Sequence, residues 1–189
     1  MGGTFDPPHL GHLISARSAA EQLKLLKVIL VPDNIQPHKL TAARSPASIR
    51  LEMTRAIAKL DPLFEVSDCE ISRGGVSYTV ETLEYLCGRY PPENYRLCWL
   101  MGWDSALDFP TWHQPERIAE LADLVALRRT GSNEDPIPQP WQAQMTVLKT
   151  PVIEISATDI RARAAAGLPI ALLVGPDVES IIKATSLYQ

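Results

Sequence analysis

The chain opens with GGTFDPPHLGH, from Gly2 to His12, and apolar residues at helical spacing follow this stretch. Glycines let the backbone come close to a ligand, and the start of a helix offers unpaired N–H groups to a phosphate. Because His9 and His12 flank Gly11 at that helix start, both imidazoles can converge on one phosphate chain. Each can donate a hydrogen bond to charge that develops on a transferring phosphate. The stretch predicts a phosphate site, and it is not a Walker A loop, because no Gly-Lys follows the glycines.

Two other interpretations of the histidine pair stay open at this point. A lone His-x-x-His is often a pair of solvent-exposed side chains, and it can also be half of a zinc site. Zinc needs a third and a fourth ligand, and the sequence has neither a Cys-x-x-Cys nor a second histidine pair. The surrounding glycines and the Thr-Phe-Asp-Pro run favour the phosphate site.

Helical and strand-like stretches alternate along the rest of the chain. Helices are expected at residues 12–27, 46–60, 78–88 and 115–122, from Thr158 and from Pro176, and strands at 28–31, 64–71, 96–101, 124–128 and 147–155. This alternation, with mostly apolar strands, implies the α/β class: a single doubly wound, mostly parallel sheet covered by helices on both faces. Residues 1–189 are expected to form a single domain with a small helical C-terminal part from about residue 157. The proline-rich stretch 132–140 is expected to be a surface loop.

The glycines come earlier than such a fold predicts. In a doubly wound sheet the glycine-rich turn follows the first, central strand. Here Gly2 and Gly3 stand at the very start of the sequence. We therefore expect that a first strand of about six to eight residues is missing ahead of Gly2, a length set by typical strands.

Composition indicates an ordinary globular protein. The 18 Lys and Arg against 22 Asp and Glu give a net charge of −4, so nothing in the overall charge attracts nucleic acid or an anionic membrane. The apolar runs are too short to cross a bilayer, and no basic-then-apolar signal peptide opens the sequence. Cys69, Cys87 and Cys98 are widely spaced and odd in number, so they do not form a disulfide framework. We expect a soluble, reduced, cytoplasmic protein with no nucleic-acid or membrane partner.

A second helix start with phosphate-binding features lies near the other end of the chain. In the stretch Ile155–Arg161, Ser156 or Thr158 can cap a helix, and Arg161 follows one turn later. Taken alone, this is simply a well-capped helix. Together with the first motif it suggests a triphosphate held between two helix starts.

Taken together, these motifs resemble those of the nucleotidylyltransferase superfamily with its His-x-Gly-His signature and, within it, those of the bacterial nicotinate-nucleotide adenylyltransferases. The matching segments run along nearly all of the chain: Gly2–His12, Pro37–Lys39, Arg73–Thr79, Met101–Ser105 with Thr111–Trp112, Arg128–Gly131 and Ile155–Arg161. The first and last mark the superfamily, and the middle segments point to nicotinate nucleotide. Two positions depart from the family pattern: Thr130 replaces a proline, and His113 follows Trp112 where some members carry an aromatic residue.

The resemblance implies a Rossmann-like nucleotidylyltransferase fold and adenylyl transfer, in which the 5′-phosphate of nicotinate mononucleotide attacks the α-phosphorus of ATP. It implies catalytic roles for His9, His12 and Lys39. ATP-binding residues would be Gly3, Thr4, Phe5, Gly11, Ser156, Thr158 and Arg161, and acceptor-binding residues would be Thr79, Asp104, Trp112 and Arg128. Mg²⁺ is expected to be carried by the ATP phosphates, without metal ligands from Asp6, Asp104 or Asp108.

Several alternatives remain beside this interpretation. The acceptor could be phosphopantetheine or nicotinamide mononucleotide, the enzyme could be a cytidylyl transferase, and the chain could be a nucleotide-binding protein without catalysis. Trp112 could be a packing residue, Arg128 a solvated strand end and Lys39 a plain surface charge. Trp99, Trp103 and Trp141 are expected to be core or loop aromatics. The sequence leaves open whether the chain forms a homo-oligomer.

Overall fold

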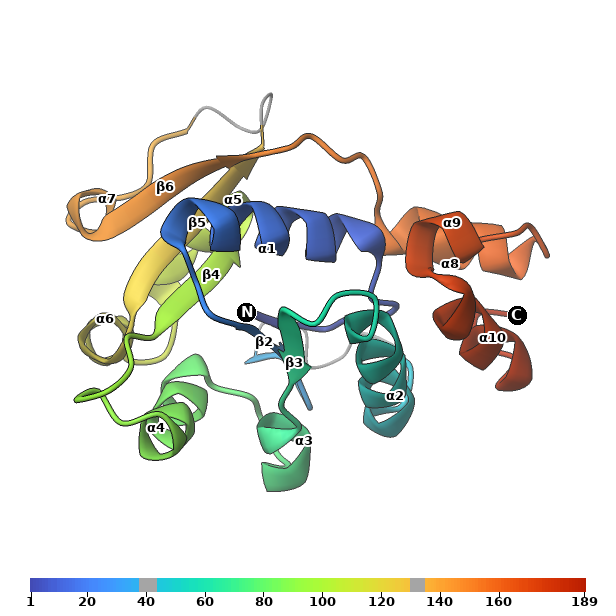
Figure 1. Cartoon of the computed structure of the whole chain (residues 1–189), viewed down its shortest axis with the longest axis horizontal. Coiled ribbons are helices and arrows are strands. Elements are labelled where there is room, and N and C mark those ends of the chain that lie inside the picture. Colours follow the sequence, from blue (N-terminus) through green and yellow to red (C-terminus); the bar gives the residue numbers. More distant parts are fainter. Residues whose placement is uncertain (38–43, 130–134) are drawn as a thin grey trace.

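Strands and helices alternate along the chain, as the sequence predicts (Figure 1). The computed structural model describes residues 1–37, 44–129 and 135–189. The elements are β1 (Gly2–Gly3), α1 (Leu10–Leu23), β2 (Val28–Pro32), α2 (Ala47–Ala58), β3 (Phe64–Val66), α3 (Cys69–Arg73), α4 (Thr79–Arg89), β4 (Cys98–Gly102), α5 (Trp103–Leu107), η2 (Phe109–Thr111), α6 (Pro115–Leu121), β5 (Asp123–Arg129), α7 (Trp141–Gln144), β6 (Met145–Thr150), α8 (Ala157–Ala165), α9 (Ala171–Val174) and α10 (Pro176–Ala184).

All of the paired strands run parallel, which confirms the predicted α/β class. Backbone pairing joins them in two three-stranded ladders, in the orders β1-β2-β3 and β4-β5-β6. The ladders meet at β1 and β4, because a Cβ added to Gly2 would come within 3.1 Å of the Trp99 ring. The predicted single sheet is thus divided at β1, which is only two residues long.

Alternating side chains of the central strands pack on opposite faces of the sheet. On β4 and β5, Leu100 and Val125 join a hydrophobic cluster with α1, α2 and α10, while Trp99 and Leu124 join a second cluster with α4 and α6. This alternation follows from the period of two residues along a strand. Figure 1 shows α1 on one side of the strands and α4 on the other. Both faces are therefore covered, as the apolar strands predict.

Several predicted elements differ in extent. The strand expected at 64–71 ends at Val66, because residues from Cys69 turn into the one-turn helix α3. The helix expected at 12–27 ends at Leu23, since Lys24 takes a left-handed conformation with φ 54°. The strand expected at 147–155 runs only from Met145 to Thr150. The two glycines expected in a turn form the strand β1 instead.

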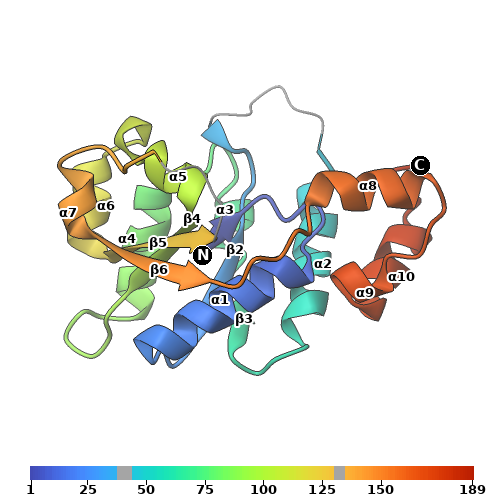
Figure 2. The same ribbon diagram turned by 90° about the horizontal axis from the view of Figure 1, so that it is seen from above.

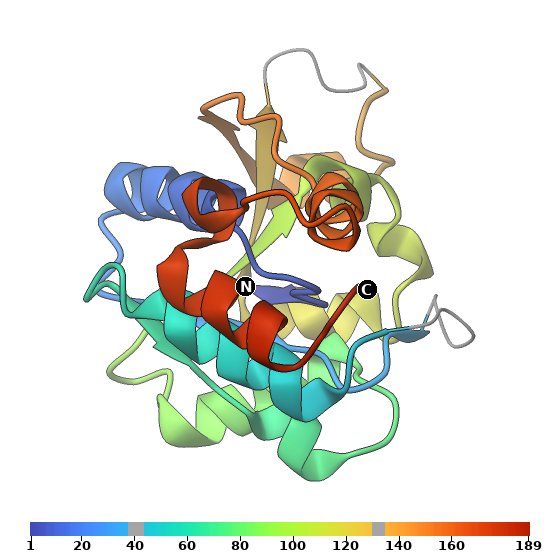
Figure 3. The same ribbon diagram turned by 90° about the vertical axis from the view of Figure 1, so that its right-hand side faces the viewer.

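The C-terminal helices pack onto the rest of the chain. Ile160, Ile170 and Val178 belong to the same hydrophobic cluster as Leu13 and Met53. Figure 2 shows α8, α9 and α10 gathered at one end of the molecule, and Figure 3 shows α10 beside α2. This arrangement brings the end of the chain close to the loop that follows β1.

The helices are short for membrane crossing. α1 has 14 residues, which at 1.5 Å per residue is about 21 Å, less than the roughly 30 Å of a bilayer core. Across residues 1–37, 44–129 and 135–189, no helix combines the length and the apolar character needed to span a membrane.

A groove of about 830 Å³ lies between β2 and β4 at their amino ends. Its walls include Met1, Val28, Leu97 and Cys98. It lies opposite the carboxyl ends of the strands and is therefore separate from the loop of the first motif.

Two leucines on helices provide a matched test of this packing. Leu83 of α4 is 1% exposed inside the second cluster, whereas Leu172 of α9 is 90% exposed. Leu83→Ala should lower the free energy of unfolding by about 2–5 kcal/mol, because it leaves a cavity. Leu172→Ala should change it by less than about 0.5 kcal/mol. Urea denaturation followed by circular dichroism measures both, and equal losses would contradict the arrangement.

Candidate active site

The loops that carry the candidate residues lie at one edge of the sheet. Thr4 follows β1, Asp33 follows β2, and Asp104 lies just after β4. Parallel strands place their carboxyl ends at a common edge, and ligands of such sheets bind where the strand order reverses. Here the order reverses between β1 and β4, so the candidate site lies beside the first motif.

His9 and His12 stack on each other at the start of α1. Their ring centroids are 3.7 Å apart with an interplanar angle of 28°. His9 is 4% exposed and is the N-cap residue, and its backbone N–H donates to Nδ1 of His12 at 3.2 Å. Because Nδ1 accepts this bond, the neutral His12 ring carries its proton on Nε2. That N–H is a donor suited to a phosphate oxygen at the helix start.

The residues around the pair leave little room for substitution. A Cβ added to Gly11 would come within 3.0 Å of Nδ1 of His9, so a side chain at this position would crowd the His9 ring. Phe5 is 2% exposed and has φ 49°, a left-handed conformation that non-glycine residues rarely adopt. Its ring meets the His12 ring edge-on at 5.1 Å.

The last motif contacts the first. Of the two possible caps that the sequence offers, Ser156 caps α8, accepting the N–H of Asp159 at 3.1 Å. Arg161 donates to the carbonyl oxygen of Asp6 at 2.9 Å, across 155 residues of sequence. It also donates to Oγ1 of Thr158 at 3.2 Å. The start of α8 and the loop before α1 therefore lie side by side, as Figure 2 shows.

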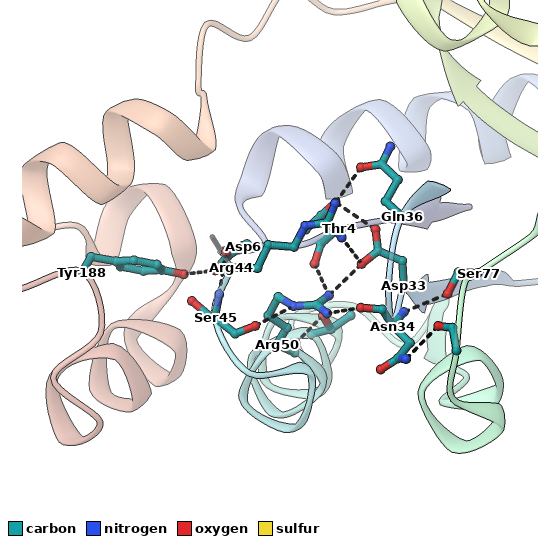
Figure 4. A network of polar contacts seen from close by, with 12 residues as sticks. Thr4, Asp6, Asp33, Asn34, Gln36, Arg44, Ser45, Arg50, Ser77 and Tyr188 are labelled. Atoms are coloured by element: carbon teal, nitrogen blue, oxygen red, sulfur yellow. Dashed lines mark hydrogen bonds and ion pairs between the residues drawn. The ribbon is translucent and has the colours of Figure 1, made fainter. Parts of the chain in front are cut away.

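The carboxylate of Asp6 holds two further segments (Figure 4). Oδ2 accepts the N–H of Ser45 at 3.0 Å, and Oδ1 accepts the hydroxyl of Tyr188 at 2.5 Å. Burial and the bond to Asp6 raise the pKa of Tyr188. Neither Asp6 nor Tyr188 is predicted as a site residue from the sequence.

A buried ion pair lies behind the first motif. Arg50 of α2 is 1% exposed and contacts Oδ1 of Asp33 at 3.0 Å. Arg44 lies 3.5 Å from the same oxygen. Oδ2 of Asp33 accepts the hydroxyl of Thr4 at 2.9 Å, and Arg50 donates to the carbonyl oxygen of Thr4 at 2.7 Å. The sequence signal for Arg50 is an arginine that shares a helix face with Met53, within an apolar pattern.

The predicted acceptor residues belong to different elements. Thr79 is the first residue of α4. Asp104 belongs to α5, and its side chain is exposed. Arg128, the residue before the last of β5, places its guanidinium over the Trp103 ring, 4.7 Å from the centroid. Trp112 is half-buried and packs on Phe109 at 5.3 Å. Trp112 therefore has a packing contact and is also partly exposed.

An aromatic contact joins two of the acceptor segments. The ring of Tyr78, next to Thr79, lies 4.6 Å from the ring of His113, next to Trp112. The sequence places these residues in separate motifs, and the fold brings the motifs together. Trp103 and Trp141 are buried in the same cluster, as expected for core aromatics.

Glu70 is a carboxylate buried beneath the loop that leads to α4. It is 5% exposed and accepts the hydroxyl of Thr82 at 2.6 Å. Burial raises the pKa of Glu70, and the hydrogen bonds from Thr82 and Ser77 offset only part of that shift.

Two expectations concern other parts of the chain. Lys39, predicted as catalytic, lies outside the described residues, as does Thr130. Within the part of the chain that the structure describes, no group of three or more His, Cys, Asp or Glu side chains gathers to hold a metal ion. The zinc interpretation of His9 and His12 thus finds no third ligand of these types there.

Comparison with known proteins gives one family. The profile of the family described as cytidylyltransferase-like matches residues 1–163. A protein of Exiguobacterium sibiricum named "Probable nicotinate-nucleotide adenylyltransferase" is 40% identical over 188 residues, covering 100% of this chain and 96% of its own length. A protein of the same name from Salinibacter ruber is 36% identical, with the same coverage of each chain.

Solved structures share the fold. The structure described as "Plasmodium falciparum nicotinic acid mononucleotide adenylyltransferase complexed with NaAD" has a TM-score of 0.77 and 18% identity. The match covers 99% of this chain and 94% of that one. At this identity the likeness concerns the arrangement of strands and helices.

Glu70 should make stability depend on pH. A carboxyl group whose pKa is raised in the folded state stabilises that state below its unfolded pKa, and this contribution is lost as pH rises through the folded pKa. Glu70→Gln removes the titration. Starting at pH 4, just below the ordinary glutamate pKa of 4.5, wild type should therefore lose stability relative to Glu70→Gln as the pH rises. Chemical denaturation across this range measures the difference, and a constant difference would contradict the assignment.

Proposed function

The chain belongs to the cytidylyltransferase-like family and, within it, to the nicotinate-nucleotide adenylyltransferases, and from that premise we propose that it transfers the adenylyl group of ATP to nicotinate mononucleotide. The products are nicotinate adenine dinucleotide and pyrophosphate. The reaction is a nucleotidyl transfer in NAD biosynthesis.

The observation that carries this proposal is the stacked pair of His9 and His12 at the start of α1, with Arg161 of α8 bonded to the loop before that helix. The pair offers a ring N–H, the start of α1 is the positive end of the helix dipole, and Arg161 adds a fixed positive charge. All of these groups favour negative charge at one place. A polyphosphate substrate meets that requirement.

The chemistry needs charge neutralisation and positioning. An oxygen of the acceptor 5′-phosphate attacks the α-phosphorus of ATP, and the bond from that phosphorus to the bridging oxygen of the β-phosphate breaks. The electron pair leaves with pyrophosphate, so no protein nucleophile is required. We assign His9, His12 and Lys39 to the charge that develops on the phosphates.

We assign the remaining first-motif and last-motif residues to ATP. Backbone groups of Gly3, Thr4, Phe5 and Gly11 would line the phosphates, and Ser156, Thr158 and Arg161 would meet them from α8. The hydrogen bond from Arg161 to Asp6 supports this assignment, because it joins the start of α8 to the loop before α1. Mg²⁺ would arrive on the phosphates with most of its waters, a binding mode that needs few protein ligands.

For the acceptor, we assign Thr79, Asp104, Trp112 and Arg128. Backbone N–H groups at the start of α4 suit the carboxylate of nicotinate, and the Trp112 ring offers an apolar face to the pyridine. The contact between Tyr78 and His113 supports this grouping, since it brings both acceptor segments together. We also propose that the protein works in the cytoplasm on these small-molecule substrates, without a nucleic-acid partner.

The first test measures pyrophosphate release from ATP and Mg²⁺ with each acceptor offered separately. Nicotinate mononucleotide should give release and a dinucleotide product, while nicotinamide mononucleotide and phosphopantetheine should give much less. Pyrophosphate release with phosphopantetheine alone would support adenylyl transfer but contradict nicotinate mononucleotide as the acceptor. No release with any acceptor would favour a nucleotide-binding protein without catalysis.

A second test concerns the histidine pair. His12→Ala removes a donor to developing charge, so kcat should fall by about 10²–10³-fold. Arg17→Ala is a control on the same helix, because Arg17 pairs with Glu21 and Asp61 at the surface. Steady-state kinetics on both variants decides the role. A His12→Ala enzyme with unchanged kcat and weaker ATP binding would show that the pair binds ATP without contributing to catalysis.

A further inference from the structure

We propose that Arg50, paired with Asp33, is a positioning residue that sets how the ATP side and the acceptor side of the site lie relative to each other. This inference rests on the proposed adenylyl transfer. It concerns two residues that the reaction itself does not use, on α2 and on the loop after β2.

The guanidinium of Arg50 contacts several separate points of the backbone (Figure 4). Nε donates to the carbonyl oxygen of Ser45 at 3.1 Å, and Nη2 donates to that of Asn34 at 3.2 Å. Nη1 donates to the carbonyl oxygen of Thr4 at 2.7 Å and to Oδ1 of Asp33 at 3.0 Å. One buried group thus holds the loops after β1 and β2 and the segment before α2.

The first arm of this network leads to the ATP side. Thr4 is held twice, through its carbonyl oxygen by Arg50 and through its hydroxyl by Oδ2 of Asp33 at 2.9 Å. Ser45, whose carbonyl oxygen Arg50 also holds, donates its N–H to Asp6 at 3.0 Å. The course of the loop between β1 and the histidines is therefore fixed by contacts with this pair.

The second arm leads to the acceptor side. The backbone N–H of Asn34 donates to Oγ of Ser77 at 2.9 Å, and its side chain donates to the carbonyl oxygen of Gly75 at 2.8 Å. The N–H of Ser77 donates to the carbonyl oxygen of Ile35 at 2.8 Å. The loop that leads to Thr79 is thus attached to the segment whose backbone Arg50 holds.

Joining the arms matters because the reaction is an in-line displacement between two bound molecules. The attacking oxygen must lie about 3–3.5 Å from phosphorus, and a displacement of about 1 Å can cost a factor of roughly 10² in rate. A planar guanidinium with five donors can bind carbonyl oxygens that lie in different directions. The desolvation free energy of a buried ion pair can exceed the attraction between its charges. We therefore assign Arg50 and Asp33 to the positioning of these loops and not to stability.

The test compares Arg50→Lys with wild type in turnover and in binding. The ligands are a non-hydrolysable ATP analogue, nicotinate mononucleotide and nicotinate adenine dinucleotide. Lysine keeps the positive charge but lacks the planar guanidinium that reaches several carbonyl oxygens at once, so kcat should fall by about 10²-fold. Affinity for the ATP analogue and for nicotinate mononucleotide should each change by less than about threefold. Nicotinate adenine dinucleotide would occupy the ATP side and the acceptor side together, so affinity for it should fall by at least about tenfold.

Arg55→Lys is the matched control on the same helix. Arg55 pairs with Asp68 at 2.9 Å, and both side chains are about half exposed, so this change should leave every value as in wild type. Equal losses of affinity for the three ligands in Arg50→Lys would indicate a merely structural role and overturn the proposal. Turnover like that of Arg55→Lys would also overturn it. If the wild-type protein itself shows no turnover, that result would instead contradict the proposed function.

Asn34→Ala tests the second arm while Arg50 stays in place, should Arg50→Lys fail to fold. It removes the side-chain bond to the carbonyl oxygen of Gly75, which lies at the surface. We expect KM for nicotinate mononucleotide to rise about fivefold, the worth of one hydrogen bond, with KM for ATP unchanged. An equal rise of both KM values, or of neither, would contradict the two-arm arrangement.

Discussion

Parallel strands place their carboxyl ends at one edge of a sheet, and this constraint decides where the candidate residues that follow β1 and β4 lie. Gly3 pairs with Pro32 at the ends of β1 and β2, and Gly102 at the end of β4 pairs with Leu127, two residues before the end of β5. These neighbouring strands therefore end within two residues of each other. Loops separated by long stretches of sequence therefore leave the sheet together. The point where the strand order reverses, between β1 and β4, then receives a loop from each half of the chain. The site depends on this edge more than on any single contact.

The sequence predicts the features that depend on local pattern. Helical spacing predicts α2, and short apolar runs predict β2 and β5, to within a few residues, because these signals lie within each element. The sequence likewise narrows the cap of α8 to Ser156 or Thr158, since the preference for a cap residue reflects contacts within one turn. The first motif was recognised from glycines and histidines that are close in sequence.

The remaining features depend on distant partners. Arg50 stands in an apolar helical stripe, and nothing near it in sequence shows that carbonyl oxygens of remote loops surround it. The helix α3 is a single turn, too short for a period to be visible. The buried carboxylate of Glu70 and the hydroxyl of Tyr188 are likewise satisfied by residues far along the chain. Such contacts appear only once the strands fix which loops meet.

The hydrogen bond between Asp6 and Tyr188 sets an order of events during synthesis. Its two residues are 182 positions apart, and Arg161 reaches the same loop from 155 positions away. Ribosomes add about 5–20 residues per second, so the first motif waits on the order of ten to forty seconds for these partners. Throughout that time the nascent chain carries its glycines and histidines without these two C-terminal partners. The first motif is therefore made well before its contacts are complete.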